Sequence, residues 1–315
     1  RVDRSVIIDV TALPNQIRLT FDAWGYNDGS IEKQIRFLFV VDKKNSLPLV
    51  FRYLPGNVVD VSSLNVTIEE LKRLGIKHSF VIIDAGFFSE DNIKELYKEK
   101  IDFLTRLPSG RRLYKELIKK EAHQIERFEN ATGYGKRALF VKKRGINLFG
   151  REAYAYIVLD PERKGRETKR FLLSAMEEEE GNREEIEYGL MNHGIMILVS
   201  SFEIEDKAIV PSYYLRHMAE TLFGFSKDDL KLLPLRVHKE ETLRGYLLII
   251  FIALIIFVRL KREIGNEYTV EEILLIMRNL KCKVYENELV IQELTKQQKE
   301  IAEILKIIVS KVMGI

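Results

Sequence analysis

Three acidic residues from separate parts of the chain are the side chains best suited to chemistry. Asp9 lies in the apolar run at residues 6–10, Asp84 directly follows the apolar run at residues 80–83, and Glu220 comes much later. Singly, such an Asp is often a turn or cap residue, and a helical Glu is often solvated. Together they supply the hard oxygen ligands that two Mg²⁺ ions, or Mn²⁺, need in order to promote an in-line phosphoryl displacement. We therefore take all three as candidate catalytic and metal-binding residues.

Residues 211–230 predict a single helix that carries Glu220 and opens with a proline. At 100° per residue, the side chains of Tyr213, Arg216, Glu220 and Lys227 fall within an arc of about 60°. Apolar residues occupy the opposite face, so one face packs and the other is presented. An Arg fork and a Lys point charge both bind phosphate groups. The polar face therefore fits an extended anionic partner.

The four polar residues of this helix also resemble a known signature. Their spacing, Tyr213-(2)-Arg216-(3)-Glu220-(6)-Lys227, resembles the YREK motif of a large group of bacterial and archaeal insertion-sequence DDE transposases. The segment VIIDAGF, which contains Asp84, is similar to their second-aspartate motif, and VIIDVT, which contains Asp9, is similar to the first. The resemblance extends from residue 5 to about residue 260.

The resemblance implies a fold and a function. The fold is α/β: a ribonuclease H-like mixed sheet with flanking helices, interrupted by a β-rich insertion between the second Asp and the Glu. The function is metal-dependent hydrolysis and strand transfer at transposon ends. The three acidic residues would ligate the metal, while Tyr213, Arg216 and Lys227 would contact phosphates. The partner would be double-stranded DNA, both at the transposon ends and at the target, and the protein would bind it as a homodimer. The protein would be cytoplasmic and associated with the nucleoid of a prokaryotic cell.

Two features depart from that family. Some relatives stack a flipped base on a Trp in the insertion, but the only Trp here, Trp24, precedes the second Asp. The rings of Tyr134, Phe140, Phe149 or Tyr154 could replace it. The chain also opens without an initiator Met, so we expect that an N-terminal DNA-recognition region is missing.

Hydrophobic patterning predicts the elements that must position these residues. A short link at residues 43–46 predicts a hairpin within a three-stranded meander. Gly75 is expected to end a helix at residues 61–74, and Ser89 to cap a helix that runs to about Lys98. The expected strands are residues 6–10, 35–41, 47–54, 80–83, 101–107 and 154–159, the fifth parallel to the fourth. The expected segments are a core at 1–107 and 201–262, an insertion at 108–200 and a helical tail at 263–315.

The part of the chain between Arg106 and Arg144 is strongly basic, with 12 Lys and Arg residues against 4 Glu. Such a stretch is where a phosphate backbone would lie, although a solvated face is an equally good interpretation. The candidate DNA-binding residues chosen from it are Arg111, Arg112, Lys142, Lys143 and Arg144.

Composition excludes several classes of protein. The 315 residues are 46% hydrophobic and 31% charged, which excludes a disordered chain, and a net charge of +3 excludes a uniformly basic coat. One cysteine, Cys282, excludes an internal disulfide and a multi-Cys zinc site. The apolar run at residues 246–258 is shorter than the roughly 20 residues of a membrane span, so we expect a buried helix and no membrane partner.

The tail predicts a capping box at Thr269 and a last helix with a stripe of apolar residues, namely Ile301, Leu305, Ile308 and Val312.

Two other functions are compatible with parts of this pattern. A catalytically inactive DNA-binding or assembly protein derived from a transposase would share the fold and the basic stretch, and only a cleavage assay separates it from an enzyme. A glycoside hydrolase would also use two carboxylates, but cations beside the acids, here Arg216 and Lys227, argue against it.

Overall fold

The computed structural model divides into two units, Arg1–Glu240 and Glu241–Ile315. The division falls inside the segment expected to form the second part of the core. The structure describes residues 4–15, 22–27, 30–58, 60–76, 78–177, 183–235, 237–265, 267–310 and 312–314.

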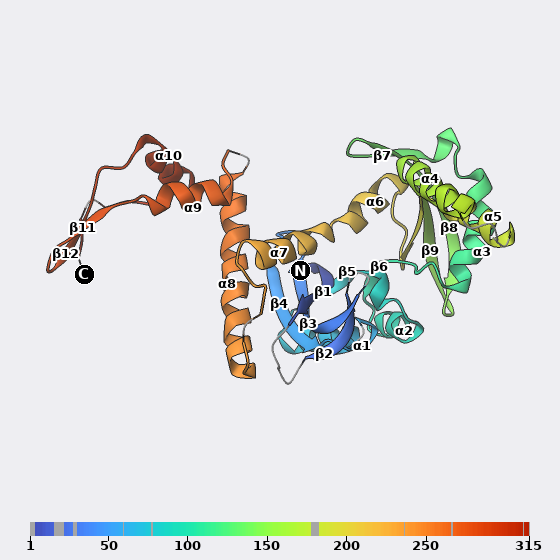
Figure 1. The fold of residues 1–315 in the computed structure, drawn as a ribbon, viewed down its shortest axis with the longest axis horizontal. Coiled ribbons are helices and arrows are strands. Elements are labelled where there is room, and N and C mark those ends of the chain that lie inside the picture. Colours follow the sequence, from blue (N-terminus) through green and yellow to red (C-terminus); the bar gives the residue numbers. More distant parts are fainter. Residues whose placement is uncertain are drawn as a thin grey trace. The chain divides into compact units, whose positions relative to one another are not determined.

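The N-terminal unit is built on one mixed sheet, which has ten strands within the described residues (Figure 1). The strand order is β2-β3-β1-β5-β6-β10-β9-β8-β7, and β4 also pairs with β3. The strands are β1 (Arg4–Pro14), β2 (Ala23–Asn27), β3 (Ser30–Asp42), β4 (Pro48–Pro55), β5 (His78–Ile83), β6 (Asp102–Arg106), β7 (Ala131–Tyr134), β8 (Arg137–Leu148), β9 (Arg151–Leu159) and β10 (Ile195–Ser200).

The central strands β1 and β5 place two of the candidate acids next to each other. Both strands are apolar, β-branched and buried, as strands covered on both faces should be. They run parallel, with Ile8 beside Ile83, so Asp9 and Asp84 follow at neighbouring positions. Strand β6 is parallel to β5, which confirms the sequence prediction. The β3–β4 hairpin is confirmed as well.

Two details of this region differ from the prediction. Strand β1 continues to Pro14 instead of ending at residue 10, and β2 was not predicted. Strand β2 is the short sequence AWGYN, which lacks a clear alternation of apolar and polar residues. It pairs with the beginning of β3, with Trp24 beside Lys33. Pairing with the long neighbouring strand β3 therefore stabilises β2, although the local sequence has little preference for a strand.

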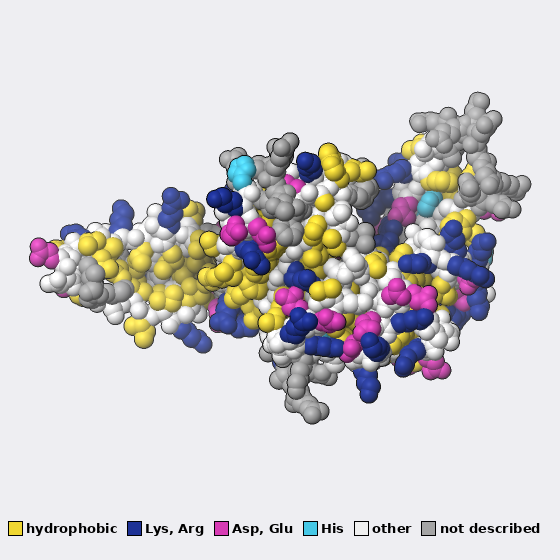
Figure 2. Space-filling view, turned by 90° about the horizontal axis from the view of Figure 1, so that it is seen from below, with side chains coloured by type: hydrophobic (Ala, Val, Ile, Leu, Met, Phe, Trp, Pro, Cys, Tyr) yellow, Lys and Arg dark blue, Asp and Glu magenta, His cyan; other side chains and the backbone are white. Residues whose placement is uncertain are grey.

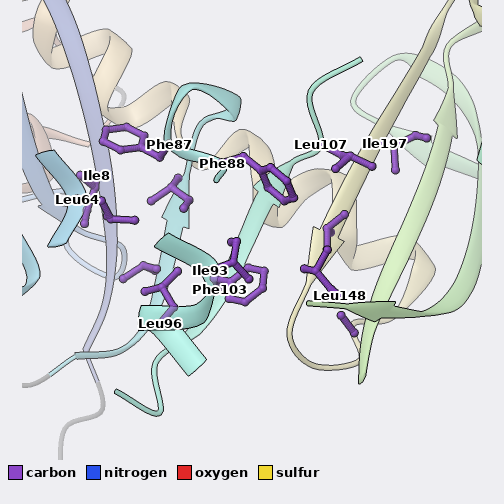
Figure 3. Packing of buried hydrophobic residues seen from close by; sticks show 14 of the residues in the cluster. Ile8, Leu64, Phe87, Phe88, Ile93, Leu96, Phe103, Leu107, Leu148 and Ile197 are labelled. Atoms are coloured by element: carbon purple, nitrogen blue, oxygen red, sulfur yellow. The ribbon is translucent and has the colours of Figure 1, made fainter. Parts of the chain in front are cut away.

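Residues 108–200 extend the same sheet. Strand β10 is antiparallel to both β6 and β9, so it joins β7, β8 and β9 to the strands that carry the acids. The hydrophobic core is correspondingly continuous: Ile8 of β1, Phe103 of β6 and Leu148 of β8 belong to one buried cluster (Figure 3). Burial of each large apolar side chain contributes about 1.5 to 3 kcal/mol. The described residues of this region also form three helices, α3, α4 and α5.

The helices of the N-terminal unit follow their predicted start and stop signals in several places. The side chain of Ser89 caps α2 by accepting a hydrogen bond from the backbone of Asn92. Gly75, with φ of +70°, follows the end of α1. The helices are α1 (Asp60–Arg73), α2 (Glu90–Lys98), α3 (Arg112–Glu121), α4 (Pro161–Glu177), α5 (Arg183–Asn192), α6 (Asp206–Tyr214) and α7 (His217–Asp228), with short 3₁₀ turns η1 (Ala85–Phe87), η2 (Ala122–Gln124) and η3 (Phe128–Asn130).

The prediction of a single helix at residues 211–230 is wrong, because helices α6 and α7 meet there at a turn formed by Leu215 and Arg216. The proline lies inside α6 instead of opening the helix. At the turn, the backbone N–H of Arg216 bonds to the carbonyl of Tyr213, a spacing of three residues. Such spacing rotates successive side chains by about 120° instead of 100°. This change takes Tyr213 out of the exposed polar line, and the Tyr213 side chain is buried.

The C-terminal unit is small and mixed. It contains α8 (Glu240–Ile264, apart from its first residue), α9 (Val270–Arg278), α10 (Lys296–Ile304) and an antiparallel sheet of β11 (Cys282–Val284), β12 (Glu288–Ile291) and β13 (Val312–Gly314). The capping box at Thr269 is confirmed. The predicted last stripe is wrong, because α10 ends at Ile304, Ile308 is 92% exposed and Val312 lies in β13.

Helix α8 contains the apolar run at residues 246–258. It buries Leu247 and Leu254 but exposes Ile249 and Ile256, so the expected burial holds for one face only. Within the described residues it is the one helix long and apolar enough to cross a membrane, a test that core helices of soluble proteins also pass. Figure 2 shows hydrophobic side chains gathered over this unit.

Candidate active site

The three candidate acids meet at one guanidinium group, that of Arg216. Its Nη1 lies 3.0 Å from Oδ1 of Asp9 and 3.6 Å from Oδ2 of Asp84, and its Nη2 lies 2.7 Å from Oε1 of Glu220. Asp9 lies in β1, Asp84 directly follows the adjacent strand β5, and Glu220 comes from the first turn of α7. Residues far apart in the sequence therefore form one cluster.

Aromatic packing holds α7 over this part of the sheet. Phe223 of α7 stacks on Phe39 of β3, with ring centroids 4.8 Å apart. Phe39 in turn lies directly beside Asp9 in the sheet register, so both side chains point to the face that α7 covers. The stacking therefore fixes where Glu220, one turn earlier in α7, reaches the aspartates.

Asp9 is 5% exposed, and its surroundings raise the pKa of its carboxyl group to about 7. Burial is the main cause, because removal from water disfavours the charged form. Arg216 opposes the shift, whereas the negative charges of Asp84 and Glu220 add to it. For Arg216, burial disfavours the charge but the acids outweigh that effect and raise its pKa. The cluster thus carries more negative than positive charge and favours a further cation.

Tyr213 and Lys227 contact the same region from α6 and α7. The hydroxyl of Tyr213 donates a hydrogen bond to Oδ1 of Asp84 over 3.0 Å, and burial together with Asp84 raises the tyrosine pKa. The ammonium group of Lys227 donates to Oγ1 of Thr11 over 2.7 Å, and burial lowers the lysine pKa. Thr11 lies two residues after Asp9 on the same face of β1, about 7 Å further along the strand.

Sequence reasoning missed a row of aromatic rings beside the acids. Nδ1 of His217 lies 3.4 Å from Oε2 of Glu220. The ring of His217 packs edge-on against Tyr214, which stacks on Tyr134 with centroids 5.1 Å apart. Of the rings proposed for base stacking, Tyr134 is thus the one that this row includes. The position of His217, three residues before Glu220 on a predicted helix, was a usable signal.

Within the described residues, none of the contacts found for the candidate DNA-binding residues in the basic stretch is with Asp9, Asp84 or Glu220; their partners are other acidic or aromatic residues. Lys142 and Arg144 both pair with Glu121, at 2.9 and 2.7 Å, and Glu121 is 1% exposed. The other three are also engaged: Lys143 pairs with Glu203, Arg112 with Glu116, and Arg111 bonds the carbonyl of Phe88 and lies over its ring. Figure 2 shows Lys and Arg interleaved with Asp and Glu on this unit.

The three candidate acids are chemically suited to bind a divalent metal ion. Three carboxylates, from Asp9, Asp84 and Glu220, lie around one guanidinium, and hard carboxylate oxygens are the ligands that Mg²⁺ and Mn²⁺ prefer. As the side chains stand, the described residues contain no group of three His, Cys, Asp or Glu placed to hold a metal, because the guanidinium of Arg216 lies among these three acids.

The chain belongs to the family of transposase DDE domains, whose model matches residues 1–256. No curated protein matches the chain. Among solved structures, it is similar to piggyBac transposase in the cryo-EM structure of a synaptic complex with hairpin DNA. The two chains are 12% identical with a TM-score of 0.51, and the match covers 95% of this chain and 51% of that one. This chain thus spans about half the length of that protein and shares its fold, a mixed α/β fold with a large sheet.

Proposed function

We propose that this chain is the catalytic domain of a DNA transposase that hydrolyses and rejoins phosphodiester bonds at transposon ends, with a ribonuclease H-like core and Asp9, Asp84 and Glu220 as its metal ligands. The observation that carries the proposal is the meeting of these three acids at Arg216. Membership of the transposase DDE family supports a transposase function.

Three carboxylates would hold Mg²⁺, or Mn²⁺ in its place. When bound, the metal would activate the attacking oxygen and neutralise charge on the scissile phosphate. In the hydrolytic step, a water oxygen attacks phosphorus, the P–O3′ bond breaks, and the freed 3′ oxygen takes up a proton. In strand transfer, that 3′-hydroxyl attacks a phosphodiester of the target DNA and displaces another 3′ oxygen.

The remaining residues of the site would position these groups. Tyr213 fixes one oxygen of Asp84 by its hydrogen bond, and His217 lies beside the second oxygen of Glu220. Lys227, held over β1 by Thr11, and Arg216 would bind phosphates that flank the cleaved bond. The candidate DNA-binding residues of the basic stretch would contact DNA only if phosphates displace their present partners. These residues are Arg111, Arg112, Lys142, Lys143 and Arg144. We further propose that the enzyme acts as a homodimer on paired transposon ends.

Strand cleavage tests the proposal. Asp9→Asn, Asp84→Asn and Glu220→Gln should each abolish Mg²⁺-dependent nicking of transposon-end DNA while leaving DNA binding, measured without metal, within about threefold, because each removes a metal ligand and no phosphate contact. The matched control is Asp229→Asn, which changes an exposed carboxylate at the end of α7 and should cleave normally. Normal cleavage by Asp84→Asn would refute the assignment.

A catalytically inactive DNA-binding protein with the same fold is the second candidate. The arrangement of the acids around one cation disfavours it, since a structural role would not require three carboxylates at one point. Purified wild-type chain that binds transposon-end DNA but never nicks it with either metal would favour this candidate.

A further inference from the structure

Arg216 stands where the metal ligands converge. We propose that Arg216 is a placeholder cation: without metal its guanidinium keeps Asp9, Asp84 and Glu220 assembled, and it must move to a DNA phosphate before a metal can bind. This inference rests on the proposed function, in which the same acids hold a divalent ion. It assigns to Arg216 a coupling between DNA binding and metal loading.

The positions of the two cations exclude each other. Nη1 of Arg216 is 3.0 Å from Oδ1 of Asp9 and 3.6 Å from Oδ2 of Asp84. A Mg²⁺ ion would have to approach these carboxylates to about 2 Å. A metal held by both aspartates would therefore lie against the guanidinium, with like charges in contact and little water between them. The arrangement around Arg216 is therefore an alternative to the metal-bound one.

The guanidinium is held by charge more than by a complete set of hydrogen bonds. Its Nε is buried and has no hydrogen-bond partner in the described part of the chain. A buried donor without a partner carries a free-energy cost, which the guanidinium would recover wherever a partner is found. A phosphate accepts two parallel N–H bonds from the fork of an Arg side chain, so DNA offers that partner.

The surroundings leave a route outward. The side chains of Asp84 and Glu220 are 37% and 42% exposed, so the site opens to solvent on their side. Arg216 lies in the turn between α6 and α7, outside both helices, and its side chain is 17% exposed. A phosphate at this opening could take the guanidinium away from the acids.

A reciprocal coupling follows. If DNA removes Arg216 from the acids, bound DNA must raise the affinity for metal, and metal must raise the affinity for DNA by the same factor. Free enzyme would then load metal poorly, and the complete site would form only on DNA.

Mn²⁺ binding to the purified full chain tests this coupling. Titration followed by the electron paramagnetic resonance of free Mn²⁺ would be done with and without a generic double-stranded oligonucleotide. We expect DNA to raise the Mn²⁺ affinity of the wild type about tenfold. Arg216→Gln should bind Mn²⁺ about tenfold more tightly than the wild type without DNA, and DNA should then add little. Arg216→Lys, which keeps the positive charge, should stay near the wild type without DNA.

Other results would separate the two proposals. Equal Mn²⁺ affinity of the wild type with and without DNA would overturn the placeholder role. This measurement uses the wild type alone, so it does not depend on whether a variant folds. Unchanged Mn²⁺ affinity in folded Arg216→Gln would overturn it too. If Asp9→Asn and Glu220→Gln still bind Mn²⁺ as the wild type does, the metal lies elsewhere and the proposed function itself fails. Loss of binding in these two variants without any DNA effect rejects the placeholder role alone.

Discussion

The hydroxyl group of Tyr213 donates a hydrogen bond to the carboxylate of Asp84, with 3.0 Å between the two oxygens. The bond joins the last turn of α6 to the end of β5, and the tyrosine is 3% exposed. A ring buried in this way fixes the orientation of the acid next to it. We infer that Tyr213 is a positioning residue for Asp84.

Tyr213→Phe removes this bond and keeps the ring. We expect the rate of Mg²⁺-dependent DNA nicking to fall about tenfold, the equivalent of about 1.4 kcal/mol, since Asp84 keeps its charge but loses its fixed orientation. Tyr214→Phe is the matched control, because its ring stacks on Tyr134 and no hydrogen bond of its hydroxyl is found within the described residues. Its rate should stay within about twofold. Equal losses in both variants would contradict the positioning role.

The stability of the metal-free protein should depend on pH through Asp9. Its pKa of about 7 in the folded chain lies above the ordinary value of 3.8, so between these values the folded state binds more protons than the unfolded state. The free energy of unfolding must therefore fall as pH rises from about 4 to about 7, by up to a few kcal/mol. Urea unfolding at several pH values, with a chelator present, measures this dependence.

Asp9→Asn tests the source of that dependence. The amide does not titrate, so the variant should gain stability relative to the wild type as pH rises from about 4 to about 7. Asp229→Asn, at an exposed position, should follow the wild-type curve. Parallel curves for the wild type and Asp9→Asn would show that another group titrates.

The parts of the site that the sequence predicts are those that depend on local patterns. Asp9 and Asp84 each come at or near the end of a buried β-branched run, and two parallel neighbouring strands put such positions side by side. Ser89 and Thr269 begin helices through side-chain caps that involve residues three positions away. Short-range rules suffice for these features.

Long-range forces decide the rest. The turn at Leu215 and Arg216 has no Gly, and the nearest Pro lies four residues earlier, so no breaker marks it. The guanidinium of Arg216 pairs with Asp9 and Asp84, which are distant in sequence, and a helical wheel can show only its third partner, Glu220. The basic stretch was likewise chosen by charge alone. Its Lys142 and Arg144 have partners brought by tertiary structure.

The ion pairs of Glu121 should be structural. Hydrogen bonds from Arg144, and further ones from Lys142, lower the pKa of Glu121, so its stabilising charge is present at neutral pH and lost as pH falls below its ordinary range. Glu121→Gln should lower the free energy of unfolding by about 2 kcal/mol, less than for a fully buried pair because Arg144 is partly exposed. Glu116→Gln, in an exposed pair with Arg112, should change it by under about 0.5 kcal/mol.

If both Glu variants unfold at the same urea concentration, the Glu121 cluster is no more important than a surface pair. Its cations would then be free to serve DNA at little cost in stability.

Two glycines should respond in opposite directions to the same substitution. Gly56 follows β4 where β2, β3 and β4 meet, and an added Cβ would lie 2.1 Å from the carbonyl oxygen of Gln34 and 2.4 Å from that of Ala23. These are backbone atoms of paired strands that cannot move aside, so Gly56→Ala should lower the free energy of unfolding by about 3 kcal/mol. Gly224 lies inside α7, and a methyl group added there would meet no atom of the described residues within 4 Å outside its own stretch of helix. Gly224→Ala should therefore raise the free energy of unfolding by about 0.5 to 1 kcal/mol through the helix propensity of Ala. Urea unfolding of both variants measures the difference, and a Gly56→Ala protein as stable as the wild type would show that the junction of the three strands has room for a side chain.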